Sequence, residues 1–148
     1  MQHVVYTEAK ASELEQLLSG EKTMIIRSSG DRQVPYEKVE VGDTLFLLRN
    51  NGEGLIRAKA TVSSVFFSEK LIKVKSLDLV SENQDKLKLS DEQIKRWGGK
   101  RYVVLVGVER VIRLYPFDIN KSKFGNMDDW IVIKDIEKIK IEEDEKDK

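Results

Sequence analysis

The sequence of 148 residues contains no cysteine and a single histidine, His3. Without cysteine there is no disulfide, no thiolate nucleophile and no cysteine-ligated metal site. A catalytic triad or a histidine-rich metal centre would rest on His3 alone, and a structural residue in a first strand is the simpler interpretation of this position. We therefore expect no metal and no cofactor, and any catalysis has to use lysine, carboxylate or hydroxyl groups.

Long apolar runs are also missing. A membrane-spanning helix needs about 20 consecutive apolar residues, and the sequence has no such stretch. No basic segment at the N-terminus leads into an apolar one, which is the arrangement of a signal peptide. We therefore expect a cytoplasmic protein with no membrane segment.

A net charge of one sign is absent as well, because 26 basic residues balance 26 acidic ones. Residues 95–113 nevertheless hold six basic residues and one acid, whereas residues 142–148 hold five acids and two lysines. With 40% hydrophobic and 35% charged residues, the composition is that of a globular chain. The length suits one domain, which we assign to residues 1–141, and we expect the charged acidic tail at 142–148 to be disordered.

Two short helices are indicated by the signals at their ends. Ser12 and Glu15 have the spacing of a capping box and Gly20 is a helix-ending residue, so a helix is predicted within residues 9–19. The second helix has the same signals at residues 90–97, with a serine and a glutamine at its start and two glycines after it.

Apolar alternation and β-branched or aromatic residues predict strands along the rest of the chain. The clearest signal is a hairpin over residues 44–67, whose connection at 50–54 is rich in asparagine and glycine. A long polar loop at 29–43 precedes it, and Pro116 is expected to end a strand at 102–114. The other predicted strands are residues 3–7, 23–28, 71–80 and 130–133. This set predicts an α+β fold around a curled, mostly antiparallel sheet.

Four short motifs occur along this order of elements. Residues 20–27 read GEKTMIIR, residues 42–45 GDTL, residues 89–93 LSDEQ and residues 98–102 GGKRY. In this order they resemble the ASCH domain family, relatives of the PUA RNA-binding fold, and the likeness covers roughly residues 10–114. The resemblance implies a PUA-like small β-barrel of mostly antiparallel strands with two short helices. It also implies that the GEKTMIIR segment lines a cleft that holds RNA or a nucleotide-like ligand.

Some bacterial members that resemble this layout are small amidohydrolases that remove the acyl group from acetylcytidine. They use a lysine, a threonine three residues later and a glutamate from the later helical segment. Carried onto this sequence, the lysine is Lys22, the threonine position holds Ile25, and the glutamate is Glu92 with Asp91 as its rival. Isoleucine supplies neither a proton nor a nucleophile, and Thr23 would be displaced by about 6 to 7 Å along a strand. The alternative source of a hydroxyl is Ser28 or Ser29. Enzymatic activity therefore stays open, with Lys22 and Glu92 as the catalytic candidates.

Lys22 and Arg27 stand at the two ends of a segment whose middle is apolar. A guanidinium at the end of a buried strand suits bidentate capture of phosphate or carboxylate, and a partly desolvated lysine suits a base or a phosphate contact. The alternatives are a solvated surface lysine and a structural ion pair of Arg27 with Asp43 or Glu92. We expect both cations to face one cleft, and the same cleft is expected to include Ser28, Ser29 and the loop at 29–42.

Aromatic residues interleaved with cations are typical of sites that bind single-stranded nucleic acid. Trp97, Arg101 and Tyr102 form one such group, and Lys121 and Lys123 belong to a second basic loop. We include these five among the predicted ligand-binding residues. Core positions for the tryptophan and the tyrosine are the alternative.

The sequence thus predicts a domain that binds RNA or a modified nucleoside in a cationic cleft. One alternative is an amidohydrolase in which Lys22 activates a water or attacks directly, Glu92 moves the proton and Arg27 holds the nucleoside. A protein-interaction module without nucleic acid is the other alternative, because the net charge is zero.

Overall fold

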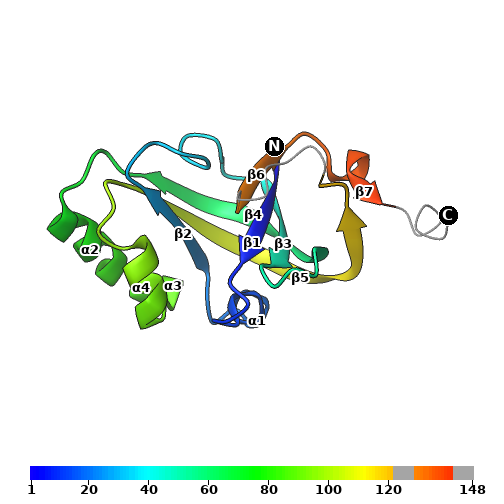
Figure 1. The fold of residues 1–148 in the computed structure, drawn as a ribbon, viewed down its shortest axis with the longest axis horizontal. Coiled ribbons are helices and arrows are strands. Elements are labelled where there is room, and N and C mark those ends of the chain that lie inside the picture. Colours follow the sequence, from blue (N-terminus) through cyan, green and yellow to red (C-terminus); the bar gives the residue numbers. More distant parts are fainter. Residues whose placement is uncertain (122–128, 142–148) are drawn as a thin grey trace.

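The computed structural model describes residues 1–121 and 129–141, and both the acidic tail and Lys123 lie outside these ranges. The strands are β1 Gln2–Thr7, β2 Met24–Ser29, β3 Thr44–Arg49, β4 Leu55–Phe67, β5 Tyr102–Ile119, β6 Trp130–Ile133 and β7 Lys140–Ile141. The helices are α1 Glu13–Ser19, α2 Lys73–Glu82, α3 Gln84–Leu87 and α4 Asp91–Trp97, with a 3₁₀ turn at Ile136–Lys138. Helices α2, α3 and α4 gather at one end of the molecule (Figure 1).

The strands form one sheet in the order β2-β5-β4-β3-β1-β6, and β7 pairs with β5. Strands β1 and β3 are parallel, while the other pairings of the described strands are antiparallel. The long strands β4 and β5 shift their register against each other at three places. Such bulges bend strands, and the sheet curls into a half-barrel (Figure 1). The predicted α+β fold with a curled, mostly antiparallel sheet is confirmed.

Strand β2 is apolar without alternation because both of its faces are covered. Ile25 faces the main core cluster inside the curl of the sheet, together with Leu17 and Val106. Met24 and Ile26 face a second cluster under helices α2, α3 and α4, which also contains Trp97. A strand buried on both faces reads as a continuous apolar run. The predicted strand in this segment is confirmed, and its two covered faces position the residues that follow.

Most of the other predicted elements are also present. The strands at 3–7 and 130–133 and the hairpin over 44–67 are confirmed. The capping box of α4 is formed on both sides, since the Gln93 amide N–H donates to the Ser90 hydroxyl and the Ser90 N–H to the Gln93 side chain. This cap fixes the start of the helix that ends in Trp97.

The predicted strand at 71–80 is wrong, because this segment is helix α2. Its apolar residues alternate as in a strand, but Ile72, Val74 and Leu77 are exposed. The helix instead buries Ser76 and Val80, which lie one turn apart. Residues four apart lie on the same face of a helix and also on the same face of a strand, so this spacing does not separate the two structures. The segment is a helix because it packs over β2 and β5.

One expected cap and one expected boundary are wrong. Helix α1 begins at Glu13, directly after Ser12, and ends before Gly20 as predicted, but Ser12 has a left-handed backbone with φ 54° and its side chain makes no cap hydrogen bond, so the capping box is absent. Pro116 does not end β5, which continues to Ile119. The proline lies where the β4–β5 register shifts between Ile56 and Ala58, and a bulge tolerates a residue without an N–H.

His3 is a fully buried residue of β1 that bonds at both ring nitrogens. The indole N–H of Trp130 donates to Nδ1 at 3.0 Å, and Nε2 lies 2.8 Å from Oδ2 of Asp43. An indole only donates, so Nδ1 accepts and Nε2 carries the proton of a neutral ring. Burial lowers the pKa of His3 below its usual 6.5, although the Asp43 hydrogen bond and charge act in the opposite direction.

We therefore expect acid to destabilise the protein through His3. The unfolded chain takes up a proton near pH 6.5 that the folded ring resists, so the free energy of unfolding falls as the pH drops below 6.5. The slope approaches about 1.4 kcal/mol per pH unit. This slope is measured by urea unfolding of the wild type and of His3→Gln, at pH values between the usual histidine pKa and the usual carboxylate pKa. The comparison isolates His3, because the chain has no other histidine. Equal slopes in the two proteins would contradict the assignment.

Candidate ligand-binding site

Arg27 is a strand residue whose guanidinium is almost completely enclosed, with 7% of the residue exposed. Its Nη1 donates to the Ile26 carbonyl at 2.8 Å, and its Nη2 donates to the Tyr6 carbonyl at 2.7 Å. The guanidinium carbon lies 5.1 Å from the ring centre of Trp97 and 5.6 Å from that of Trp130. Two carbonyls and two cation–π contacts therefore fix this cation in one orientation.

Two clefts meet at Arg27. The small cleft, of about 180 Å³, lies between the end of β2, the loop after it and the start of β5. The large cleft, of about 330 Å³, lies between the end of β1, the β3–β4 turn and α4. Arg27, Trp97 and Asp129 line both clefts and form their shared wall.

Aromatic rings form one side of the small cleft. Tyr36 and Tyr102 pack edge to face with ring centres 5.7 Å apart, and the Arg32 guanidinium lies over both rings. The Tyr36 hydroxyl donates to the Ser68 carbonyl at 2.5 Å, which ties the long loop to the end of β4. The Ser28 hydroxyl donates to the Trp97 carbonyl at 2.5 Å, which joins β2 to α4. The remaining polar lining is Ser29, Asp31 and Gln33.

Cations are concentrated in the large cleft. The Arg96 guanidinium lies 4.4 Å from the Trp97 ring centre and pairs with Glu8 at 2.9 Å. Lys121 reaches the same cleft above Gly54, where a Cβ would collide with its ammonium group. Gly54 has φ +71°, so the turn needs glycine for its backbone as well as for this close approach. The lining has three cations against two carboxylates, Glu8 and Asp129.

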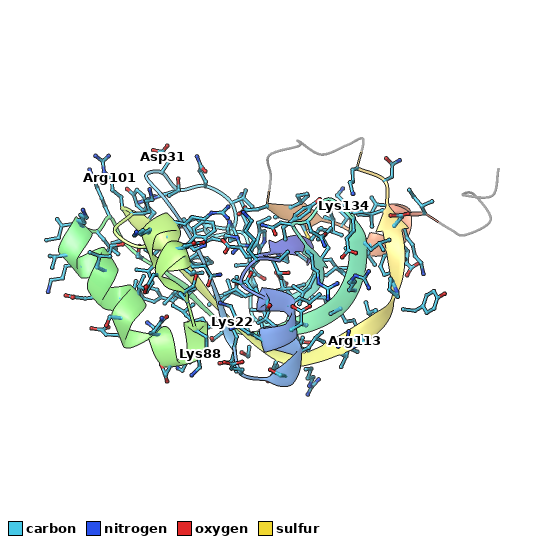
Figure 2. The ribbon with its side chains drawn as sticks, turned by 60° about the horizontal axis from the view of Figure 1, so that its bottom comes forward. Lys22, Asp31, Lys88, Arg101, Arg113 and Lys134 are labelled. Atoms are coloured by element: carbon cyan, nitrogen blue, oxygen red, sulfur yellow. The ribbon has the colours of Figure 1, made fainter. Side chains whose placement is uncertain are left out.

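Lys22 lines neither of these clefts. Its ammonium is buried with 1% of the residue exposed, lies 3.2 Å from the Glu13 carboxylate and donates to the Leu87 carbonyl at 2.5 Å. Burial lowers its pKa below the usual 10.5, and the Glu13 charge opposes that shift. Figure 2 shows Lys22 in the interior beside α1. The two expected cations therefore do not face one cleft, because Glu13 holds Lys22 inside the protein.

The other residues predicted from the sequence fall into two groups. Glu92 and Asp91 are exposed on the first turn of α4 and line neither cleft. Arg101 projects outward at the edge of the molecule (Figure 2) and also lines neither. Ile25 lies in the main core cluster. The predicted residues that do line the clefts are Arg27, Ser28, Ser29, Trp97, Tyr102 and Lys121.

Several lining residues were not found from the sequence. Tyr36 was part of the predicted functional loop but was not singled out, although an aromatic residue in a long polar loop is a usable signal. Asp129, which immediately precedes β6, and Glu8, which follows β1, had no distinguishing pattern. The described residues contain no group of three potential metal ligands. No helix among residues 1–121 and 129–141 is long and apolar enough to cross a membrane.

The Glu13–Lys22 pair gives a stability prediction. Glu13→Gln leaves the buried ammonium without its counter-charge, so we expect the free energy of unfolding to fall by about 3 kcal/mol in urea titration. Glu15→Gln, on the exposed face of the same helix, removes a partner of Arg49 and should cost less than about 1 kcal/mol. The double variant Glu13→Leu/Lys22→Met, which removes both charges, should be more stable than Glu13→Gln. Equal effects of the two single variants would show that the pair is not buried.

Comparisons with known proteins identify solved structures with the same fold. No protein-family model matches the sequence, and no curated protein does. Among solved structures, ASCH from Zymomonas mobilis aligns over 90% of this chain and 87% of its own, with a TM-score of 0.67 and 12% identity. Two mutants of that protein align with TM-scores of 0.68 over 93% of this chain. At this identity the likeness concerns the fold alone, and the chain has an ASCH-like α+β fold of the PUA-like small-barrel type.

Proposed function

We propose that this protein binds RNA or a modified nucleoside in the two clefts that meet at Arg27. The observation that carries the proposal is their shared wall. A fixed guanidinium and an indole ring border both clefts at once, so a ligand in either cleft has a cation and an aromatic surface within reach. The ASCH-like fold adds support by analogy only, since one fold hosts many functions.

The two clefts suit different parts of a nucleotide. The small cleft has aromatic side chains at Tyr36 and Tyr102 and neutral polar groups at Ser29 and Gln33, which match the faces and edges of a base. Its charged lining is one guanidinium against two carboxylates, which disfavours a phosphate there. The large cleft has an excess of one positive charge, which favours the sugar–phosphate part.

Binding is favoured over hydrolysis by the positions of the candidate catalytic groups. A hydrolase needs its base and acid within hydrogen-bond reach of one substrate. The Lys22 ammonium is engaged by Glu13 and the Leu87 carbonyl, whereas the Glu92 side chain is in solvent. Ile25, at the threonine position of the amidohydrolases, is enclosed in the core. None of these three supplies a reactive group to the clefts.

We expect the protein to bind short single-stranded RNA with an affinity that falls as salt rises from about 50 to 200 mM. Lys121→Ala should weaken binding of all sequences and reduce the slope of log affinity against log salt by about one, because it removes a phosphate contact. Fluorescence anisotropy with labelled oligonucleotides measures both quantities. The matched control is Lys134→Ala, since Lys134 is exposed (Figure 2) and lines neither cleft. Equal losses in the two variants would contradict the large cleft as the binding site.

We also expect acetylcytidine to bind without being hydrolysed. Binding to the native state raises the melting temperature, and chromatography should recover the nucleoside intact. Release of acetate that is abolished in Lys22→Ala would instead favour the amidohydrolase. If neither RNA nor the nucleoside binds at low salt, a protein-interaction role replaces both proposals.

A further inference from the structure

Three charges lie together at the shared wall of the two clefts. One oxygen of Asp129, Oδ2, is 3.4 Å from Nε of Arg27 and 3.5 Å from Nη2 of Arg96. Charge-assisted hydrogen bonds between such groups are about 2.7 to 2.9 Å long. A single carboxylate oxygen thus lies between two guanidinium groups without forming a short bond to either.

Among the residues that the structure describes, the buried Nε–H of Arg27 finds no hydrogen-bond acceptor in bonding geometry. Its four other N–H groups belong to the two terminal nitrogens, both of which bond backbone carbonyls. Leaving a buried donor unpaired is unfavourable, and more so when the group is charged. The acceptor next to Nε is therefore the Asp129 carboxylate oxygen, which lies 3.4 Å away and does not complete a hydrogen bond to it.

Both guanidinium groups are held in place before any ligand arrives. Arg27 is fixed by the carbonyls of Ile26 and Tyr6 and by two indole rings. Arg96 is held by Glu8 and by the face of Trp97. A phosphate group offers separate oxygens to the two guanidiniums, so it bonds both at normal length where one carboxylate oxygen does not.

We propose that Arg27 and Arg96 form a phosphate clamp that the Asp129 carboxylate occupies in the free protein and leaves when a ligand phosphate binds. This inference rests on the proposed function and adds to it the ligand's phosphate and a competing internal anion. Arg27 lines both clefts and Arg96 lines the large one, so a base in the small cleft and a phosphate held by the clamp would belong to one nucleotide.

Asp129 can leave the clamp without unfolding the strand that follows it. Its backbone carbonyl accepts from the Tyr6 N–H at 3.0 Å, which holds the main chain in place. Its side chain is 37% exposed, so rotation about the side-chain bonds carries the carboxylate into solvent. The exchange therefore involves one side chain and a fixed pair of cations.

The decisive variant is Asp129→Asn, which keeps the shape of the side chain and removes the competing charge. We expect its affinity for a labelled single-stranded oligonucleotide to rise about tenfold, equivalent to one charge-assisted contact. The salt slope should become steeper by about one. Asp78→Asn is the matched control, because Asp78 is exposed on α2, lines neither cleft and gives the same change in net charge. Its affinity should stay at the wild-type value.

A second arm tests the clamp with inorganic phosphate alone. Phosphate should raise the melting temperature of Asp129→Asn more than chloride at the same ionic strength does, and more than it raises that of Asp78→Asn. Melting in chloride without ligand shows that both variants are folded. A selective rise with phosphate shows that the clamp binds a phosphate group without the rest of the RNA.

The outcomes distinguish the two proposals. If the wild type binds RNA and Asp129→Asn binds it no more tightly, the clamp is wrong and the proposed function stands. If neither RNA nor acetylcytidine binds to any of the proteins but phosphate selectively stabilises Asp129→Asn, the clamp stands and the proposed function is wrong. If RNA, acetylcytidine and phosphate all fail with every protein, both proposals are overturned. Tighter binding in Asp78→Asn as well would reduce the effect to net charge and also overturn the clamp.

Discussion

The site depends on the immobilisation of one guanidinium group. Arg27 lies among the Tyr6 carbonyl at the end of β1, Trp97 at the end of α4 and Trp130 at the start of β6, elements that are far apart in the sequence. Because its terminal nitrogens are used in backbone bonds, the cation cannot follow a ligand, and the ligand has to fit the cation. Enclosure in aromatic surface also strengthens the interaction of this charge with any anion that approaches.

Lys22 and Arg27 illustrate how two cations from one motif come to have different roles. Gly20 ends α1 with φ 82°, and the chain then returns under the helix, so that Lys22 meets Glu13 from that helix. Arg27 lies in β2, the strand that follows Lys22, and reaches the border of two clefts. The first cation is used within the fold, whereas the second faces the clefts. A motif match alone does not separate these roles, because burial of a partner charge decides between them.

The sequence predicted the elements whose signals are local. The capping box of α4, the hairpin at 44–67 and the apolar strand before Arg27 all appear where expected. It failed at 71–80, where buried positions four residues apart fit both a helix and a strand. It predicted the arginine and the tryptophan of the shared wall, but not the carboxylate of Asp129, because that residue joins the wall only through the pairing of β6 with β1.

The flanking of Arg27 by two indole rings has a practical consequence. Trp97 and Trp130 are the only tryptophans of the chain, and both contact the guanidinium at the border of the clefts. The tryptophan fluorescence of the protein therefore originates within one small volume next to the candidate site. Indole emission, excited apart from that of the four tyrosines, is a built-in spectroscopic probe of any change beside Arg27 and needs no dye or label.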